Sequence, residues 1–182
     1  MDDLVVRAMV KWPHVPHCYG WLALDARGEW YMRDDRVQAA GPFPQVKGSR
    51  ITHDKLKAFI ERNYLADVCG NWYFQNGPQR VYVELEASPW VWRLQRLETD
   101  GLTIHSHTGQ AARHLQAWLD ESGRLFLTTD LGFGIVHTAD MALAGDAVES
   151  QLWSPREGRF EDFGAMFGYR LRPEPEMAGR PG

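Results

Sequence analysis

One four-residue spacing constrains the fold of this 182-residue chain more than any other feature. It is Asp-x-x-Gly, which occurs three times, at 25–28, 67–70 and 120–123. In a type I turn, aspartate at the first position accepts a backbone N–H, and glycine at the fourth adopts a positive φ without steric cost. Each glycine is followed by a polar residue and an apolar pair, as a returning strand requires. The spacing therefore predicts three β-hairpins.

The aspartates of these turns have two interpretations. They either bind a metal ion, as Asp-rich loops do, or only stabilise the turn. A site normally occurs once, whereas this spacing occurs three times, so we interpret it as the bend of a repeated hairpin. An aromatic-Leu pair precedes each turn, but its distance from the aspartate varies. An internal repeat therefore remains an open alternative.

Further strands and two helices are predicted from the spacing of apolar residues. Val81, Val83 and Leu85 alternate with polar residues, and the run 90–97 meets "ETDG" and returns as 102–107, which is typical of a hairpin. A helix is expected at 53–63 with Thr52 as its cap. A second is expected at 139–150, capped by Thr138, and a short strand at "YRLR" near the end.

Strands dominate this pattern, so the predicted class is α+β, mainly antiparallel β, with repeated hairpins and about two inserted helices. The expected organisation is a β-rich subdomain at 1–87 that carries the helix 53–63, a second β-rich subdomain at 88–172, and a disordered tail at 173–182.

Composition excludes several classes of partner. The net charge is −4 and the pI is about 6.0, and no basic run occurs, which argues against a nucleic-acid partner. No stretch approaches the roughly 20 apolar residues of a membrane span, and the first residues lack a signal-peptide pattern. Cys18 and Cys69 are therefore expected to be reduced thiols, and the cytoplasm is the expected compartment.

Two segments, "KWPHVPHCYGWLALDARGEWYMRDDRV" and "RNYLADVCGNWYFQNGPQRVYVELE", resemble an uncharacterised family of proteobacterial domains of unknown function. Membership would cover nearly the whole chain. The order of hairpins, helix and strands is also similar to another uncharacterised bacterial family of repeated β-rich motifs with a proposed ligand-binding or signalling role. Neither resemblance implies catalytic residues.

The best candidate ligand site lies on the hairpin 90–107. His105 and His107 are two apart on a strand and so share a face. A two- or four-residue loop at "ETDG" would add Trp90, Trp92, Leu94 and Arg96 to that face, whereas a three-residue loop would add Val91, Arg93 and Gln95. The first register makes an aromatic, basic recess for a planar or anionic molecule. The predicted ligand-binding residues are Trp90, Trp92, Arg96, His105 and His107.

We therefore expect a non-enzymatic module that binds a small ligand or a protein partner, with no metal or other cofactor. The chain contains no P-loop, no Gly-x-Ser-x-Gly and no His-Glu-x-x-His motif. The alternative is a metal-dependent, hydrolase-like enzyme that uses a cluster drawn from His14, His17, His105, His107 and His137. A homodimer that pairs the strand 102–107 edge to edge is a third interpretation.

Overall fold

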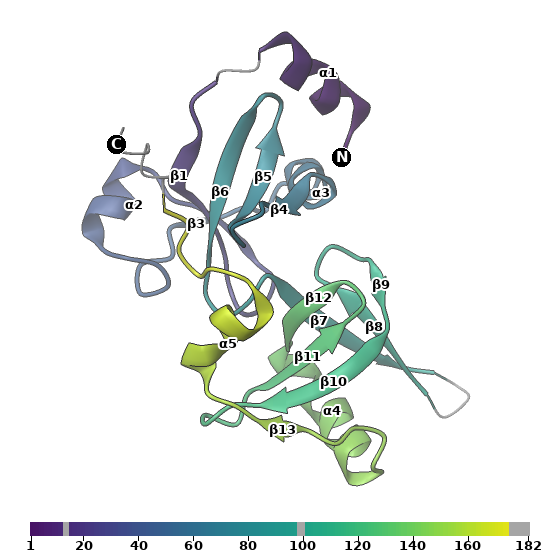
Figure 1. Ribbon diagram of the computed structural model, residues 1–182. Coiled ribbons are helices and arrows are strands. Elements are labelled where there is room, and N and C mark those ends of the chain that lie inside the picture. Colours follow the sequence, from purple (N-terminus) through teal and green to yellow (C-terminus); the bar gives the residue numbers. More distant parts are fainter. Residues whose placement is uncertain (13–14, 98–100, 175–182) are drawn as a thin grey trace, which may run out of the picture. The chain divides into compact units, whose positions relative to one another are not determined.

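The structure is a computed structural model that describes residues 1–12, 15–97 and 101–174. Its contacts divide the chain into two units (Figure 1). Unit 1 contains Met1–Ala23, Trp30–Glu84 and the described residues from Arg170 onward, and unit 2 contains Leu24–Glu29 and Leu85–Tyr169. The units are thus interleaved along the chain, whereas the predicted subdomains 1–87 and 88–172 are consecutive. Of the predicted tail 173–182, residues 175–182 lie outside the described residues.

Unit 1 is built on a six-stranded sheet in the order β3-β2-β1-β6-β5-β4. The strands are β1 (Cys18–Leu24), β2 (Trp30–Met32), β3 (Ser49–Arg50), β4 (Tyr64–Ala66), β5 (Trp72–Asn76) and β6 (Gln79–Leu85). Its helices are α1 (Asp3–Lys11), α2 (Asp35–Ala40) and α3 (Asp54–Arg62). The pairs β2–β3, β4–β5 and β5–β6 are antiparallel.

Helix α3 confirms the helix predicted at 53–63, but Thr52 is not its cap. The Nδ1 atom of His53 accepts the backbone N–H of Leu56 instead. Phe59 packs edge-on against Phe74 of β5, with ring centroids 5.4 Å apart. The apolar face of the helix therefore lies on the sheet, as its helical spacing predicted.

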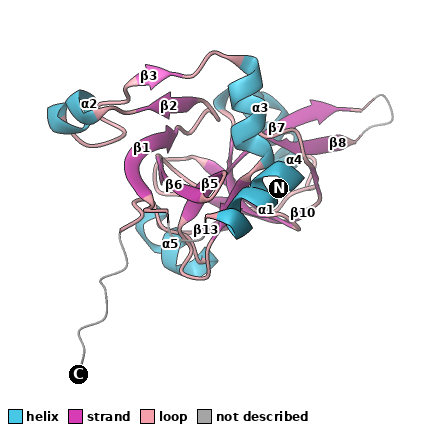
Figure 2. Ribbon diagram, turned by 90° about the horizontal axis from the view of Figure 1, so that it is seen from above, coloured by secondary structure: helices cyan, strands magenta, loops and turns pink. Residues whose placement is uncertain are grey.

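Unit 2 is built on a seven-stranded sheet in the order β13-β10-β11-β12-β7-β8-β9. The strands are β7 (Trp90–Arg96), β8 (Leu102–Ser106), β9 (Ala111–Ala112), β10 (His114–Leu119), β11 (Leu125–Thr129), β12 (Gly132–Val136) and β13 (Arg156–Glu157). Figure 2 shows β7 and β8 side by side as the predicted antiparallel hairpin. The pairs β7–β12 and β10–β13 are parallel, so the sheet is mixed.

Helix α5 (Phe160–Phe167) covers one part of this sheet with an aromatic cluster. The ring of Phe133 stacks on Phe167 at 3.9 Å with an interplanar angle of 8°, and Phe163 packs edge-on against both Phe126 and Phe133. Phe126 and Phe163 are fully buried. Stacked and edge-to-face aromatic pairs add to the gain from burial, so this cluster is the core of unit 2.

The three predicted turns have the same hydrogen bonds. In each, the glycine N–H donates to the aspartate carbonyl, and Oδ1 of the aspartate accepts two further backbone N–H groups at 2.8–3.0 Å. The φ angles of the glycines are +78°, +81° and +76°. The carboxylates are therefore occupied by their own turns, which confirms the interpretation that they stabilise the turns.

A fourth turn of this kind was missed because it begins with serine. At Ser106, the backbone N–H of Gly109 donates to the Ser106 carbonyl, and the hydroxyl accepts the N–H of Gln110. Gly109 has a φ of +82°. Serine makes the same local bond as aspartate with a shorter, weaker acceptor. This turn places β9 beside β8.

Helices are more numerous than predicted. The segment expected at 139–150 is a short 3₁₀ turn, η1 (Thr138–Asp140), followed by α4 (Met141–Glu149), and His137 rather than Thr138 caps it by accepting the N–H of Ala139. Helices α1, α2 and α5 were not predicted, and no strand forms at "YRLR". The class α+β, rich in strands, is confirmed. No helix within the described ranges is long and apolar enough to cross a membrane.

Candidate functional site

The register of the β7–β8 hairpin decides which residues share a face. Arg93 pairs with His105, Trp92 pairs with Ser106, and the N–H of Leu97 donates to the carbonyl of Gly101. Three residues therefore separate the last bonded pair, so His105 lies opposite Arg93 and not opposite Trp92. The expectation that Trp90, Trp92, Arg96, His105 and His107 share one strand face is therefore wrong in register. Two of these residues do meet, because the rings of Trp90 and His107 lie 5.8 Å apart.

The two tryptophans belong to the core of the sheet. Trp92 is 0% exposed and Trp90 is 6% exposed, and their rings lie 6.0 Å apart in a stacked arrangement. Their Nε1 atoms donate to the carbonyls of Leu131 and Leu127. The backbone of Gly134 passes so close that a Cβ there would lie 2.6 Å from Trp90 Cβ. Neither indole has a face left for a ligand.

His107 holds the start of β7. Its ring Nδ1 accepts the backbone N–H of Val91 at 3.3 Å, and the backbone N–H of His107 donates to the Val91 carbonyl. A Cβ added at Gly28 would lie only 2.7 Å from the Cβ of His107. The imidazole is therefore packed against a turn, in a structural position.

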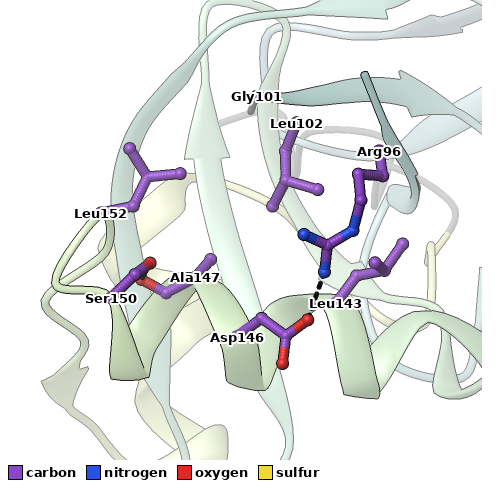
Figure 3. Close-up of a pocket in the computed structure, with 8 residues that line it drawn as sticks. All are labelled: Arg96, Gly101, Leu102, Leu143, Asp146, Ala147, Ser150 and Leu152. Atoms are coloured by element: carbon purple, nitrogen blue, oxygen red, sulfur yellow. Dashed lines mark hydrogen bonds and ion pairs between the residues drawn. The ribbon is translucent and has the colours of Figure 1, made fainter. Parts of the chain in front are cut away.

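Arg96 and His105 do line cavities. The first cavity, of about 270 Å³, lies between β7, β8 and α4, and in Figure 3 Arg96 reaches across to the carboxylate of Asp146. Both partners of this ion pair are more than half exposed, so the pair neutralises charge here more than it stabilises the fold. The cavity is lined by Arg96, Gly101, Leu102, Leu143, Asp146, Ala147, Ser150 and Leu152.

The second cavity, of about 490 Å³, shares Gly101, Leu102 and Leu152 with the first. We call the two together the β8 groove. The second cavity is lined by Gly101, Leu102, Thr103, Ile104, His105, Ala111, Ala112, Arg113, His114, Leu152 and Trp153. No carboxylate among the described residues lines it, while one arginine and two histidines do.

The polar groups of the second cavity differ in their environment. His114 stacks on Trp153 with ring centroids 5.1 Å apart, and burial lowers the pKa of its imidazole. Its Nε2 is buried and has no hydrogen-bond partner among the described residues. The side chain of Arg113 is exposed and forms no ion pair within the described part of the chain. The cavity thus offers a cation, a neutral imidazole and an indole.

Sequence reasoning missed Arg113, His114 and Trp153. The fourth turn, with serine in place of aspartate, brings β9 back along β8 and carries the chain on to Arg113 and His114. Recognising Ser106-x-x-Gly109 as a relative of the aspartate turns would have predicted this strand. Trp153 follows α4, and no local pattern places it beside a residue 39 positions earlier.

The described histidines of the enzyme alternative have separate local surroundings. His17 packs edge-on against Tyr82 in unit 1, while His105 lines the β8 groove and His137 caps η1. His14 lies outside the described residues. Within the described residues, no three His, Cys, Asp or Glu side chains are grouped to hold a metal ion.

A comparison with known protein families identifies the family of this chain. One family model matches residues 1–178, almost the whole sequence. The chain belongs to that family, "Protein of unknown function (DUF2946)". This membership confirms the predicted resemblance to an uncharacterised family. No curated protein matches this DUF2946 chain.

Two solved structures are similar to this DUF2946 chain. One is a DUF1285 family protein from Silicibacter pomeroyi DSS-3, with 12% identity and a TM-score of 0.50 over 80% of this chain and 84% of that one. The other is a DUF1285 family protein from Shewanella baltica OS155, with 14% identity and a TM-score of 0.45 over 69% and 91%. At this identity the first likeness concerns the fold alone.

Proposed function

We propose that this protein is a non-enzymatic ligand-binding module whose β8 groove takes a small organic anion with an apolar or aromatic body. The observation that carries this proposal is the lining of the second cavity, where Arg113, His105 and His114 lie among apolar side chains and no described carboxylate lines the wall. The nearby carboxylate of Asp130 is bonded to the backbone N–H of Arg113. Ligand sites are typically apolar hollows of roughly 300–1,000 Å³ with a few convergent polar groups, and about 490 Å³ fits that range.

The roles within the groove follow from the side chains. Arg113 supplies a fork of donors for a carboxylate, because its guanidinium forms no internal ion pair among the described residues. The neutral imidazole of His114 offers a hydrogen bond through its buried Nε2. Leu102, Ile104 and Leu152 supply apolar contact. A small organic anion with an apolar body would use the cation, the imidazole and the apolar contacts together.

The absence of a disulfide between Cys18 and Cys69 supports a cytoplasmic setting for this function. Cys18 and Cys69 are both free in the structure. Proteins of oxidising compartments commonly pair their cysteines, so we include the cytoplasm in the proposal.

The test is a titration of the protein with phenylacetate, followed by two-dimensional NMR. We expect shifts at the amides of 102–105 and 111–114 and at the indole of Trp153. Arg113→Gln should weaken binding by about 10- to 150-fold, because a hydrogen bond to a charged group contributes about 1.5–3 kcal/mol. Arg36→Gln removes the same charge from the exposed face of α2 and should change nothing.

Two results would contradict the proposal. One is the absence of any shift in the β8 groove with millimolar phenylacetate. The other is equal weakening by Arg113→Gln and Arg36→Gln, which would reduce the effect to net charge.

A further inference from the structure

A second hollow lies in unit 1, between helix α3 and the sheet. Its volume is about 320 Å³ and its walls are almost entirely apolar. Leu22, Phe74 and Val81 line it from the sheet, and Leu56, Phe59 and Ile60 line it from α3. We call it the α3 cleft. Nothing in the β8 groove contributes to it, so it calls for its own explanation.

The mouth of the α3 cleft exposes large apolar side chains. Trp21 is 41% exposed and Met32 is 48% exposed, and both line the cleft. Burying such surface is favourable by about 25 cal/mol per Å², so leaving it open has a cost that an apolar occupant would recover. Scattered single apolar residues need no explanation, but here they rim a hollow that is itself apolar.

A neighbouring hollow carries charge. It lies along α1, has a volume of about 400 Å³, and shares Phe59 and Asn76 with the α3 cleft. Its charged lining residues are Arg7 and Lys11, and no described carboxylate lines it. Lys11 lies over the ring of Trp12, and neither cation is paired with a carboxylate among the described residues. An apolar space thus continues into a cationic one.

We propose that unit 1 binds a medium-chain fatty acid, with the acyl chain in the α3 cleft and the carboxylate at Arg7 and Lys11. Charge complementarity selects the occupant. A neutral hydrocarbon would leave the two cations unused, and a peptide would bring polar backbone groups into a cleft that has few partners for them. A single apolar tail with one anionic end satisfies both parts.

The thiol of Cys18 provides a direct reporter, because it lines the α3 cleft and is only partly buried. The experiment uses the full chain carrying Cys69→Ser, which removes the exposed second thiol. Serine is suitable there because Ser122 occupies the equivalent position of the third turn, with the same backbone bond to its aspartate. The rate of alkylation of Cys18 by iodoacetamide is then measured against octanoate and octanol.

We expect octanoate to slow the alkylation and to act at about fivefold lower concentration than octanol, as one exposed ion pair allows. Lengthening the acid from hexanoate to octanoate should improve protection by up to about fourfold per added CH₂. The double variant Arg7→Gln, Lys11→Gln should remove the advantage of octanoate over octanol. Both positions are exposed, so these changes leave the core intact.

The matched control is Arg36→Gln with Lys55→Gln, which removes the same two residue types from exposed sites outside both hollows. It should keep the advantage of octanoate. Alkylation that octanoate does not slow overturns the proposal. Equal protection by octanoate and octanol in the parent protein also overturns it, because the carboxylate would then have no partner. If both double variants lose the advantage of octanoate over octanol equally, the proposal is also overturned.

Discussion

The two units cover their sheets in different ways, and their cavities differ accordingly. In unit 2, helix α5 covers the sheet with closely stacked rings, and the two cavities at β8 are lined partly by polar and charged side chains. In unit 1, helix α3 makes an edge-on aromatic contact and leaves an apolar cleft beside it. Aromatic residues therefore do not indicate a binding surface by their number alone. What distinguishes core from site is whether a second layer covers them.

The largest effect should come from removing a covered aromatic residue. We expect Trp92→Ala to reduce the free energy of unfolding by about 3–5 kcal/mol, because a fully buried indole leaves a cavity. Trp21→Ala, at the open cleft of unit 1, should cost less, about 1–2 kcal/mol, because 41% of this residue is exposed. Chemical denaturation of both variants makes the comparison, and equal losses would contradict the contrast between the two units.

Close backbone packing in unit 2 should give the next effect. In Gly134→Ala the new Cβ would meet Trp90 Cβ, the Trp90 carbonyl oxygen and Trp92 Nε1, all at 2.6 Å. We expect a loss of about 1–3 kcal/mol in unfolding free energy. Gly145→Ala, on α4 with nothing within 4 Å of the new atom, should instead stabilise by about 0.5–1 kcal/mol. Thermal and urea unfolding measure both variants, and a Gly134→Ala variant that loses no stability would show that the sheet tolerates the shift.

The aspartate turns allow a smaller comparison between the units. Asp67→Ala in unit 1 and Asp120→Ala in unit 2 each free two backbone N–H groups, and each should cost about 1–2 kcal/mol. Asp67 also accepts longer bonds from the neutral groups of Asn71 and Tyr82, at 3.1 and 3.3 Å. Asp120 instead accepts a 2.7 Å bond from the charged Arg124 and is almost fully buried, so its loss should be the greater. Urea denaturation of the two variants tests the order, and a greater loss at Asp67 would reverse it.

The smallest effect concerns pH and the β8 groove. Burial holds the pKa of His114 below 6.5, so the unfolded chain takes up this proton at a higher pH than the folded chain does. The stability contributed by His114 is therefore complete above pH 6.5 and is lost as pH falls towards the folded pKa. We expect His114→Gln to reduce the difference in unfolding free energy between pH 7.5 and pH 5. An unchanged difference would show that the imidazole is solvated.

Local chemistry made much of the fold predictable. Asp25, Asp67 and Asp120 act through bonds to residues two and four positions away, so the turn is encoded within five residues. The helix at 54–62 was predictable from its apolar spacing for the same reason. Helix α5 was overlooked although Phe160, Phe163 and Phe167 have helical spacing. Gly168, in the left-handed conformation, is the C-terminal cap of that helix.

The candidate site was less predictable because it depends on register. "ETDG" suits loops of two, three or four residues, and a change of one moves His105 to the opposite face. Arg96 and His105 each line a hollow, while their predicted partners Trp90 and Trp92 lie in the core. The residues that complete the groove, His114 and Trp153, come from segments joined only by tertiary packing.

The turns also bear on the order in which this chain folds. Each closes on its own carboxylate or hydroxyl within five residues, and such short closures take little time and little chain entropy. The parallel pairing of β7 with β12 joins residues 90–92 to residues 134–136, a far longer closure. We expect the hairpins to form early and that pairing late, with φ-values near the turn at Asp120 above those at Val136.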